Sequence, residues 1–218
     1  PVYFLRHDDY FRRDGIYGEA GRDYPDNCQR FTFFCRAVLE SIRLLDLNTD
    51  LIHANDWQTG LLPALLETEH RSNPLYESIA TLLTIHNLAY QGCFDAGAMT
   101  ITGMDWRYFN WHQAEFHGKL NLLKTGIVFA DAINTVSPTY AEEIQAPEQG
   151  CGLDPVLRTR ADVLSGIING IDTSDWNPQT DPHIAANYSA SNWREGKSVC
   201  KEALQREMML EPNPHRPV

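Results

Sequence analysis

The fold is decided by residues 50–66, which read DLIHANDWQTGLLPALL. The apolar run at 50–54 predicts a buried strand, and the leucines between 61 and 66 predict a helix soon after it. Pro63 is tolerated in that helix only within its first turn. A strand that leads into a helix in this way is the repeating unit of a parallel α/β sheet.

The same alternation of elements continues along the chain. Apolar runs predict further strands at 2–5, 79–85, 132–136 and 162–168. Apolar residues at helical spacing predict helices at 31–45, 116–128 and 194–210. The strand at 79–85 has no polar alternation, which indicates burial on both faces. We therefore predict an α/β fold in which a Rossmann-like parallel sheet is flanked by helices.

Composition excludes several functional classes. With 18 basic and 29 acidic side chains, the net charge of −11 argues against a duplex nucleic-acid binder, which needs a basic face. No apolar run approaches the roughly 18 residues of a transmembrane helix. The five cysteines include no C-x-x-C pair. This argues against a disulfide framework or a thiolate zinc site, and it predicts mostly buried, reduced thiols.

Polar side chains gather after the strand at 50–54, where ligands of open α/β sheets bind. Asp56 has oxygens that can accept hydrogen bonds from sugar hydroxyls, and Trp57 has a flat face on which a sugar could stack. The alternative is that Asp56 caps the following helix and Trp57 packs against it. His53 and Asp56 alone are weak evidence for metal binding without a third ligand, so we predict no metal site.

A second polar cluster follows the strand at 79–85. It consists of His86, Asn87, Tyr90 and Gln91, with a glycine at position 92. Four hydrogen-bonding side chains at the end of a strand favour a binding or catalytic site. The alternative for His86 is a structural role, which is the more common one for a single histidine.

Three other features carry weaker signals. Asn169 follows the strand at 162–168, but Asn-Gly is a common turn pair, so a simple turn is the alternative there. Lys119 and Lys124 fall in the predicted helix 116–128, where lysines are normally solvated. The alternative is that a basic side chain near a groove rich in hydroxyl groups contacts a substrate. Residues 8–26 form a long loop with charged and aromatic side chains, for which a functional role is a reasonable expectation.

The segments around these residues resemble a known enzyme family. They are HANDWQTGL at 53–61, TIHNLAYQG at 84–92, EFHGK at 115–119, LKTGI at 123–127, TVSPTYAEEI at 135–144 and GIINGID at 166–172. In this order and spacing they are similar to the retaining glucosyltransferases that elongate glycogen and starch, the bacterial glycogen synthase and plant starch synthase family. Two positions depart from the family pattern, Asn55 where histidine is common and Thr125 where alanine is common.

The resemblance implies an architecture. The family has the GT-B fold, in which two Rossmann-like domains face each other across a cleft. By resemblance, residues 1–211 are the later part of the N-terminal catalytic domain, and residues 212–218 begin the link to a C-terminal nucleotide-binding domain. The chain opens on Pro1 and lacks the family's early Lys-x-Gly-Gly-Leu loop, so we expect a piece of a longer enzyme that is inactive by itself.

The resemblance also implies a reaction. The expected donor is ADP-glucose, the acceptor is an α-1,4-glucan (glycogen or starch), and no cofactor is expected. His86 and Asp56 are the expected catalytic residues. The expected substrate-binding residues are Asn169, Asn87, Tyr90 and Trp57. We expect neither a nucleic-acid nor a membrane partner, and a location in the bacterial cytoplasm, or in the plastid for a plant protein.

Two alternatives stay open. One is another GT-B glycosyltransferase that uses a different nucleotide sugar. The other is a non-catalytic glucan-binding module, which draws some support from the aromatic residues Trp106, Tyr108, Phe109 and Trp111. Packing under the loop that carries them is the more ordinary role for such side chains.

Overall fold

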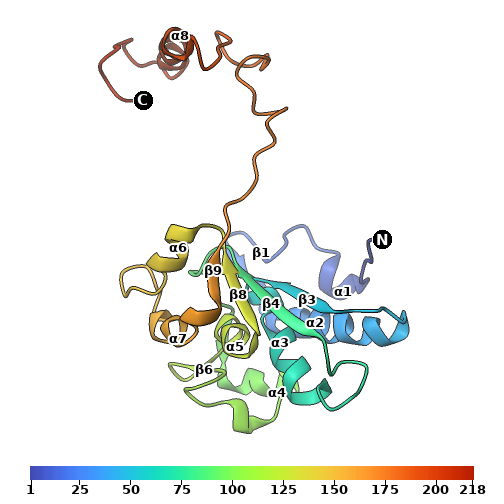
Figure 1. Cartoon of the computed structure of the whole chain (residues 1–218). Helices are drawn as coiled ribbons and strands as arrows, with labels where there is room; N and C mark the ends of the chain where they lie inside the picture. Colours follow the sequence, from blue (N-terminus) through green and yellow to red (C-terminus); the bar gives the residue numbers. More distant parts are fainter. The chain divides into compact units, whose positions relative to one another are not determined.

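The computed structural model describes residues 1–218, and the chain divides into two compact units, Pro1–Ile168 and Asn169–Val218. Unit 1 is built on a four-stranded sheet with the strand order β3-β4-β8-β9 (Figure 1). Its strands are β3 (Leu51–Asn55), β4 (Ala80–Ile85), β8 (Ala132–Thr135) and β9 (Leu164–Gly166). All three pairings are parallel, which confirms the predicted α/β fold and four of the predicted strands.

Helices connect these strands. The longer ones in unit 1 are α2 (Asn27–Leu44), α3 (Leu61–Leu65), α5 (Leu122–Phe129), α6 (Pro138–Glu143) and α7 (Asp154–Thr159). The short ones are α1 (Asp8–Phe11), α4 (Met99–Thr102), the π-helical turn η2 (Leu66–His70) and the 3₁₀ turns η1 (Trp57–Thr59), η3 (Ala96–Ala98), η4 (Trp106–Tyr108) and η5 (Ala161–Val163). At the start of α6 the Ser137 hydroxyl accepts a hydrogen bond from Tyr140 N (3.3 Å), so this side chain caps the helix.

The core of unit 1 lies on one face of the sheet. Ile52, Leu83 and Ile133 join a buried cluster with residues of α2, α3 and α5. On the opposite face of β3, His53 and Asn55 are exposed. The prediction of a buried strand at 50–54 is therefore wrong for one face, because nothing in unit 1 covers that side of β3. Of the residues in β4 only the first is exposed, which is closer to the predicted burial on both faces.

The helix predicted from residue 116 begins only at Leu122, because a β-hairpin precedes it. The hairpin strands are β6 (Glu115–Phe116) and β7 (Lys119–Asn121), and β7 also pairs antiparallel with β5 (Cys93–Asp95). His117 and Gly118 turn the chain with φ of 52° and 77°, as a two-residue hairpin turn requires. Asn121 then caps α5 by accepting a hydrogen bond from Lys124 N (2.8 Å).

The predicted strand at 2–5 does not form. Val2 and Phe4 are exposed, and no strand pairs with this segment. A strand needs a neighbour to accept and donate its backbone hydrogen bonds, and an apolar run alone does not supply one. The first pairing in the chain is a short hairpin of β1 (Gly18–Glu19) with β2 (Arg22–Asp23).

Unit 2 is built around α8 (Trp193–Glu207), which confirms the predicted final helix apart from its last residues. Gln205 is buried, and its amide exchanges two hydrogen bonds with the backbone of Asn213 (3.1 and 3.0 Å). Gly196 lies against Tyr188, where an added Cβ would come within 2.4 Å of the side chain. Neither unit contains a helix with the length and hydropathy needed to span a membrane.

The cysteines fall into different environments. Cys28 and Cys35 on α2 are buried, whereas Cys93 and Cys151 are exposed, so the prediction of mostly buried thiols is wrong. Burial raises the pKa of Cys28 to about 11 and that of Cys35 to about 12. The two buried thiols therefore stay protonated at neutral pH.

We expect alkylation to separate these two pairs. Because the thiolate is the reactive form, iodoacetamide at about pH 8 should modify Cys151 in the native chain, and Cys93 more slowly, since burial raises the pKa of Cys93 too. It should spare Cys28 and Cys35 until denaturant is added. Peptide mass spectrometry measures each site. Labelling of native Cys35 at the rate of Cys151 would contradict the buried position of this face of α2.

The start of α3 and the middle of α5 approach so closely that only glycine fits between them. A Cβ on Gly60 would lie 2.2 Å from Leu122 O, and a Cβ on Gly126 would lie 2.9 Å from Gly60 Cα. Both obstacles are backbone atoms, which cannot move aside as the end of a flexible side chain can. This contact fixes the position of the segment that connects β3 to α3.

Gly60→Ala should therefore destabilise the chain by about 1–3 kcal/mol or more, the range for overpacking a close contact. For a protein of this size, each kcal/mol lowers Tm by roughly 2–4 °C. Gly97→Ala is the matched control, because its Cβ would meet nothing within 4 Å. Thermal unfolding measures both variants, and equal Tm values would show that the close approach does not exist.

Candidate functional site

Two of the three polar segments identified in the sequence meet at one edge of the sheet. β3 and β4 are neighbouring parallel strands, so the loops that follow them leave from the same edge. Asp56 N donates to Thr84 O (2.9 Å), which extends the pairing of the two strands into the loop. The segments 53–60 and 84–92 are therefore joined where both strands end.

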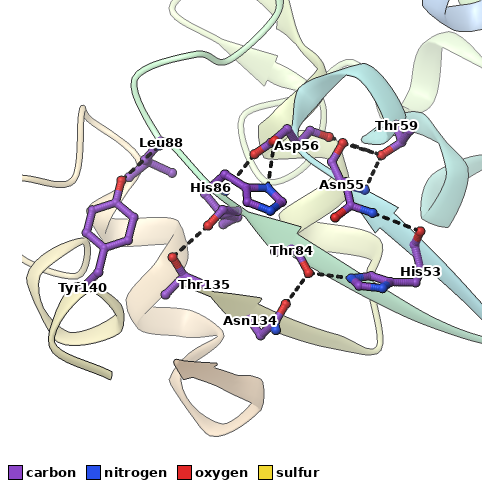
Figure 2. Close-up of polar contacts among 11 residues, drawn as sticks. His53, Asn55, Asp56, Thr59, Thr84, His86, Leu88, Asn134, Thr135 and Tyr140 are labelled. Carbon is purple, nitrogen blue, oxygen red and sulfur yellow. Dashed lines mark hydrogen bonds and ion pairs between the residues drawn. The ribbon is translucent and has the colours of Figure 1, made fainter. Parts of the chain in front are cut away.

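Asp56 and His86 make the central contact at this edge (Figure 2). Asp56 Oδ1 accepts a hydrogen bond from His86 N (2.8 Å), and Asp56 Oδ2 lies 2.9 Å from His86 Nδ1. Asp56 has a φ of 57°, in the left-handed region that is strained for a residue with a side chain. Its carboxylate makes no capping bond to the following helical turn, so it fixes the neighbouring loop instead.

The Asp56 carboxylate also orients the imidazole of His86. An ionised carboxylate only accepts hydrogen bonds, so in the neutral ring Nδ1 carries the proton and Nε2 is left as an acceptor. The His86 side chain is 48% exposed. The ring therefore presents a fixed, accessible nitrogen to the space beside it.

A cavity of about 620 Å³ opens beside this pair, within the size range of small-molecule sites. All five predicted site residues of unit 1 line it. They are Asp56, Trp57, His86, Asn87 and Tyr90. No lysine or arginine lines the cavity. It therefore offers hydrogen-bonding groups and aromatic walls, but no positive side chain for an anion.

The lining residues differ in what they can offer a ligand. Tyr90 is 66% exposed, so both its ring and its hydroxyl are accessible. Asn87 accepts a backbone hydrogen bond within its own loop through Oδ1 (3.0 Å). Trp57 is buried and packs edge-to-face on Phe31, with 4.9 Å between ring centroids, and a Cβ on Gly92 would come within 2.3 Å of the indole. Trp57 is thus packed as a wall of the cavity.

Another wall was not identified from the sequence. Tyr17 and Asp23 reach the cavity from the β1–β2 hairpin, and Cys93 and Phe94 reach it from β5. The long aromatic loop at 8–26 was a signal for the first pair. No sequence pattern indicated Cys93 and Phe94, because their position depends on the pairing of β5 with β7, which are distant in the sequence.

A buried arginine on α2 holds the β1–β2 segment in place. The Arg30 guanidinium donates to Tyr10 O (2.7 Å), Ile16 O (2.9 Å) and Asn27 Oδ1 (2.6 Å), and burial lowers the pKa of Arg30. Asn27 Nδ2 in turn donates to Tyr17 O (2.8 Å). The path of the loop, and with it the position of Tyr17 at the cavity, depends on α2.

His53 does not belong to this cluster. Its Nε2 lies 2.5 Å from Thr84 Oγ1, which donates to Asn134 Oδ1 (2.5 Å), so a polar row crosses β3, β4 and β8 (Figure 2). His53 and Asp56 therefore have different partners. The chain contains no group of three or more His, Cys, Asp or Glu side chains placed to hold a metal ion.

The two lysines considered from the sequence are placed differently from the prediction. Lys119 lies on β7, and Lys124 on α5 is buried. Lys124 Nζ donates to the backbone oxygens of Trp111 and Glu115 (2.6 Å each), and burial lowers its pKa. Lys124 thus fastens the segment before β6 to α5, and it is not available to a ligand.

Asn169 is the first residue of unit 2 and is exposed, so it is not assigned to the cavity. Nearby, Asp172 Oδ1 accepts hydrogen bonds from Ser174 N (2.8 Å) and Asp175 N (3.2 Å), and these bonds lower the pKa of Asp172. A local turn therefore begins at Asp172, whereas residues 169 and 170 are not in a turn, so the simple Asn-Gly turn is wrong as an alternative for Asn169.

Comparison with known proteins identifies what the chain is similar to. The model of the starch synthase catalytic domain matches residues 1–159. A glycogen synthase of Rhodopirellula baltica is 49% identical over 218 residues, which are 100% of this chain and 43% of that protein. A glycogen synthase of Anaeromyxobacter sp. is 50% identical over 219 residues, 100% of this chain and 46% of that protein. The chain spans less than half the length of these relatives.

A solved structure is similar as well. It is the catalytic domain of starch synthase IV from Arabidopsis thaliana bound to ADP and acarbose, with a TM-score of 0.74 and 34% sequence identity. The match covers 94% of this chain and 41% of that one. At this identity the likeness is one of sequence as well as of fold.

The contact between Asp56 and His86 predicts the effect of Asp56→Asn on the imidazole. The asparagine oxygen can still accept from His86 N, but its NH₂ group then faces Nδ1 and must donate to it. We expect the neutral His86 ring to move its proton from Nδ1 to Nε2, which ¹⁵N chemical shifts of the imidazole detect. Asp162→Asn, at an exposed position outside the cavity, is the control. An unchanged His86 tautomer in Asp56→Asn would contradict the contact.

Proposed function

The chain belongs to the family of the starch synthase catalytic domain, and we propose that it supplies one wall of a glucosyltransferase site. The proposed reaction transfers glucose from ADP-glucose, with retention of configuration, to the end of an α-1,4-glucan. The observation that carries the proposal is the Asp56–His86 contact beside a cavity with no cationic side chain, which suits a neutral sugar. The similar starch synthase is described as bound to ADP and acarbose, which supports the donor and the glucan.

The residues of the cavity have distinct roles in this proposal. Glucosyl transfer passes through a transition state with oxocarbenium character, so the site has to hold the sugar hydroxyls rigidly and exclude water. Asp56 fixes His86, whose free Nε2 accepts a hydrogen bond from a hydroxyl of the transferred glucose. Asn87 and Tyr90 provide further hydrogen-bonding groups, and the packed Trp57 closes the apolar side. His86, Asn87 and Trp57 are held by contacts within the chain before the substrate arrives.

The wider assignments are part of the same proposal. Residues 1–211, which include unit 1 and most of unit 2, form the later part of an N-terminal GT-B domain, and residues 212–218 begin the link to a nucleotide-binding domain. Asn169 is proposed as a further sugar-binding residue on the family resemblance alone. The diphosphate of the donor is bound by residues outside this chain's cavity, because no lysine or arginine lines it. The enzyme acts in the bacterial cytoplasm, or in the plastid if its source is a plant.

A chimera tests the proposed reaction. This chain replaces the matching 218 residues of the Rhodopirellula baltica glycogen synthase, and the purified chimera is assayed for transfer of labelled glucose from ADP-glucose to glycogen. We expect transfer by the chimera and none by the 218-residue chain alone. Transfer only from another nucleotide sugar would support the alternative donor, and a folded chimera without any transfer would contradict the proposal.

His86→Ala in the chimera should lower kcat by the equivalent of about 2–4 kcal/mol, with a much smaller change in KM, if His86 contacts the sugar mainly in the transition state. A purely structural histidine would instead lower Tm and yield and leave kcat nearly normal in the folded protein. His112→Ala removes an exposed histidine outside the cavity and is the matched control. Steady-state kinetics and thermal unfolding on the same preparation separate these results.

A further inference from the structure

A second cavity of unit 1 has no part in the site described above. It has a volume of about 440 Å³ and is lined by Thr68 and Glu69 of η2 together with residues of the segment 103–108. None of its residues lines the cavity of Asp56 and His86. The segment 103–108 follows α4, and Figure 1 shows α4 at the end of unit 1 opposite α6, which follows the carboxyl end of β8.

The most conspicuous group in this second cavity is a half-exposed indole. Trp106 is 51% exposed and lies edge-to-face on Phe109, with 5.6 Å between ring centroids, so one side of its ring is packed and the other is accessible. The neighbouring Tyr108 packs edge-to-face on Phe129 of α5 (5.9 Å), which anchors the η4 turn to the core. A large apolar face is therefore kept at the surface on a fixed support.

Polar side chains surround the indole and are held in place as well. Asp105 Oδ1 accepts a hydrogen bond from Arg107 N (2.9 Å) and caps η4, while the Arg107 guanidinium donates to the Tyr108 hydroxyl (2.6 Å). Glu69 forms a two-bond ion pair with Arg36 of α2 (2.9 Å each). The cavity thus combines carboxylate acceptors and a guanidinium donor with one flat apolar wall.

These groups fit a carbohydrate better than other ligands. A pyranose ring has an apolar face that can lie on an indole and hydroxyls at its rim that can bond to carboxylate and guanidinium groups. A phosphorylated ligand would meet the carboxylates of Asp105 and Glu69, with Arg107 as the one basic lining residue. We propose that this cavity is a second glucan-binding site, with Trp106 as its platform. The choice of an α-1,4-glucan among carbohydrates rests on the proposed function.

A second site of this kind has a clear physical consequence. A glucan held at Trp106 is tethered to the protein, so its other branches and chain ends are present near the first cavity at a raised effective concentration. The cavity at Trp106 needs no reacting group for this purpose. It contains no histidine, and both of its carboxylates already have partners within the chain.

Affinity electrophoresis of the 218-residue chain in native gels that contain glycogen tests the proposal. Glycogen should retard the chain, whereas dextran, an α-1,6-linked glucan, should retard it less. Trp106→Ala should weaken glycogen binding by about 10-fold or more, as removal of a central aromatic anchor does. Trp106→Phe, which keeps an aromatic platform, should lie between Trp106→Ala and the unchanged chain.

Trp111→Ala is the matched control, because Trp111 is 71% exposed, lies in the same segment and does not line the cavity. It should bind glycogen as the unchanged chain does. No retardation of the unchanged chain, normal binding by folded Trp106→Ala and Trp106→Phe, or equal losses in Trp106→Ala and Trp111→Ala would each overturn the proposal. Loss of binding in His86→Ala with none in Trp106→Ala would assign the glucan to the first cavity and overturn it too.

The binding experiment and the chimera assay distinguish a failure of the second glucan site from a failure of the proposed transfer reaction. A chimera that transfers glucose normally, with glycogen binding unaffected by Trp106→Ala, would overturn the second site and leave the reaction in place. Binding of glycogen that depends on Trp106, in a chain whose chimera transfers nothing, would support the second site as a glucan-binding surface without the transfer reaction.

Discussion

The candidate site depends on one carboxylate that joins two loops. Asp56 accepts hydrogen bonds from the backbone N and the Nδ1 of His86, and its own backbone N donates to Thr84 O. These three bonds offset the strain of a left-handed backbone conformation at a residue with a side chain, which costs on the order of 1–3 kcal/mol. A strained backbone that several hydrogen bonds maintain is typical of functional sites. Such a backbone places a side chain in a position that an unstrained loop would not give it.

Glycines place the two loops on the body of unit 1. The contact of Gly60 with Leu122 brings the segment after β3 against α5, and the contact of Gly92 with Trp57 brings the segment after β4 against the buried indole. Both contacts are too short for any Cβ. The loops of the site are therefore supported by packed backbone and by a large buried ring, so the Asp56–His86 contact rests on a rigid base and not on two mobile loops.

The sequence predicted those features that local patterns determine. Apolar runs and helical spacing identified the parallel sheet, and the rule that ligands bind beyond the carboxyl ends of strands identified five residues that do line one cavity. The sequence did not predict features that depend on contacts between residues far apart in the chain. The exposed face of β3, the burial of Lys124 under two backbone oxygens and the pairing of β5 with β7 all follow from contacts between separate segments. The β6–β7 turn was local but was hidden by apolar residues whose spacing also suits a helix.

The charges of the first cavity limit it to one part of the donor in the proposed reaction. The chain carries a net charge of −11, and the first cavity contains the carboxylates of Asp23 and Asp56 without any lysine or arginine. A diphosphate is repelled by such a lining, whereas a neutral glucosyl group finds acceptors for its hydroxyls. Under the proposed function, unit 1 therefore binds the sugar end of the donor, and the countercharges for the diphosphate come from residues outside this lining. A nucleotide sugar has a neutral sugar end and an anionic diphosphate end. A site with two differently charged walls orients the nucleotide sugar, because each wall favours only one of these ends.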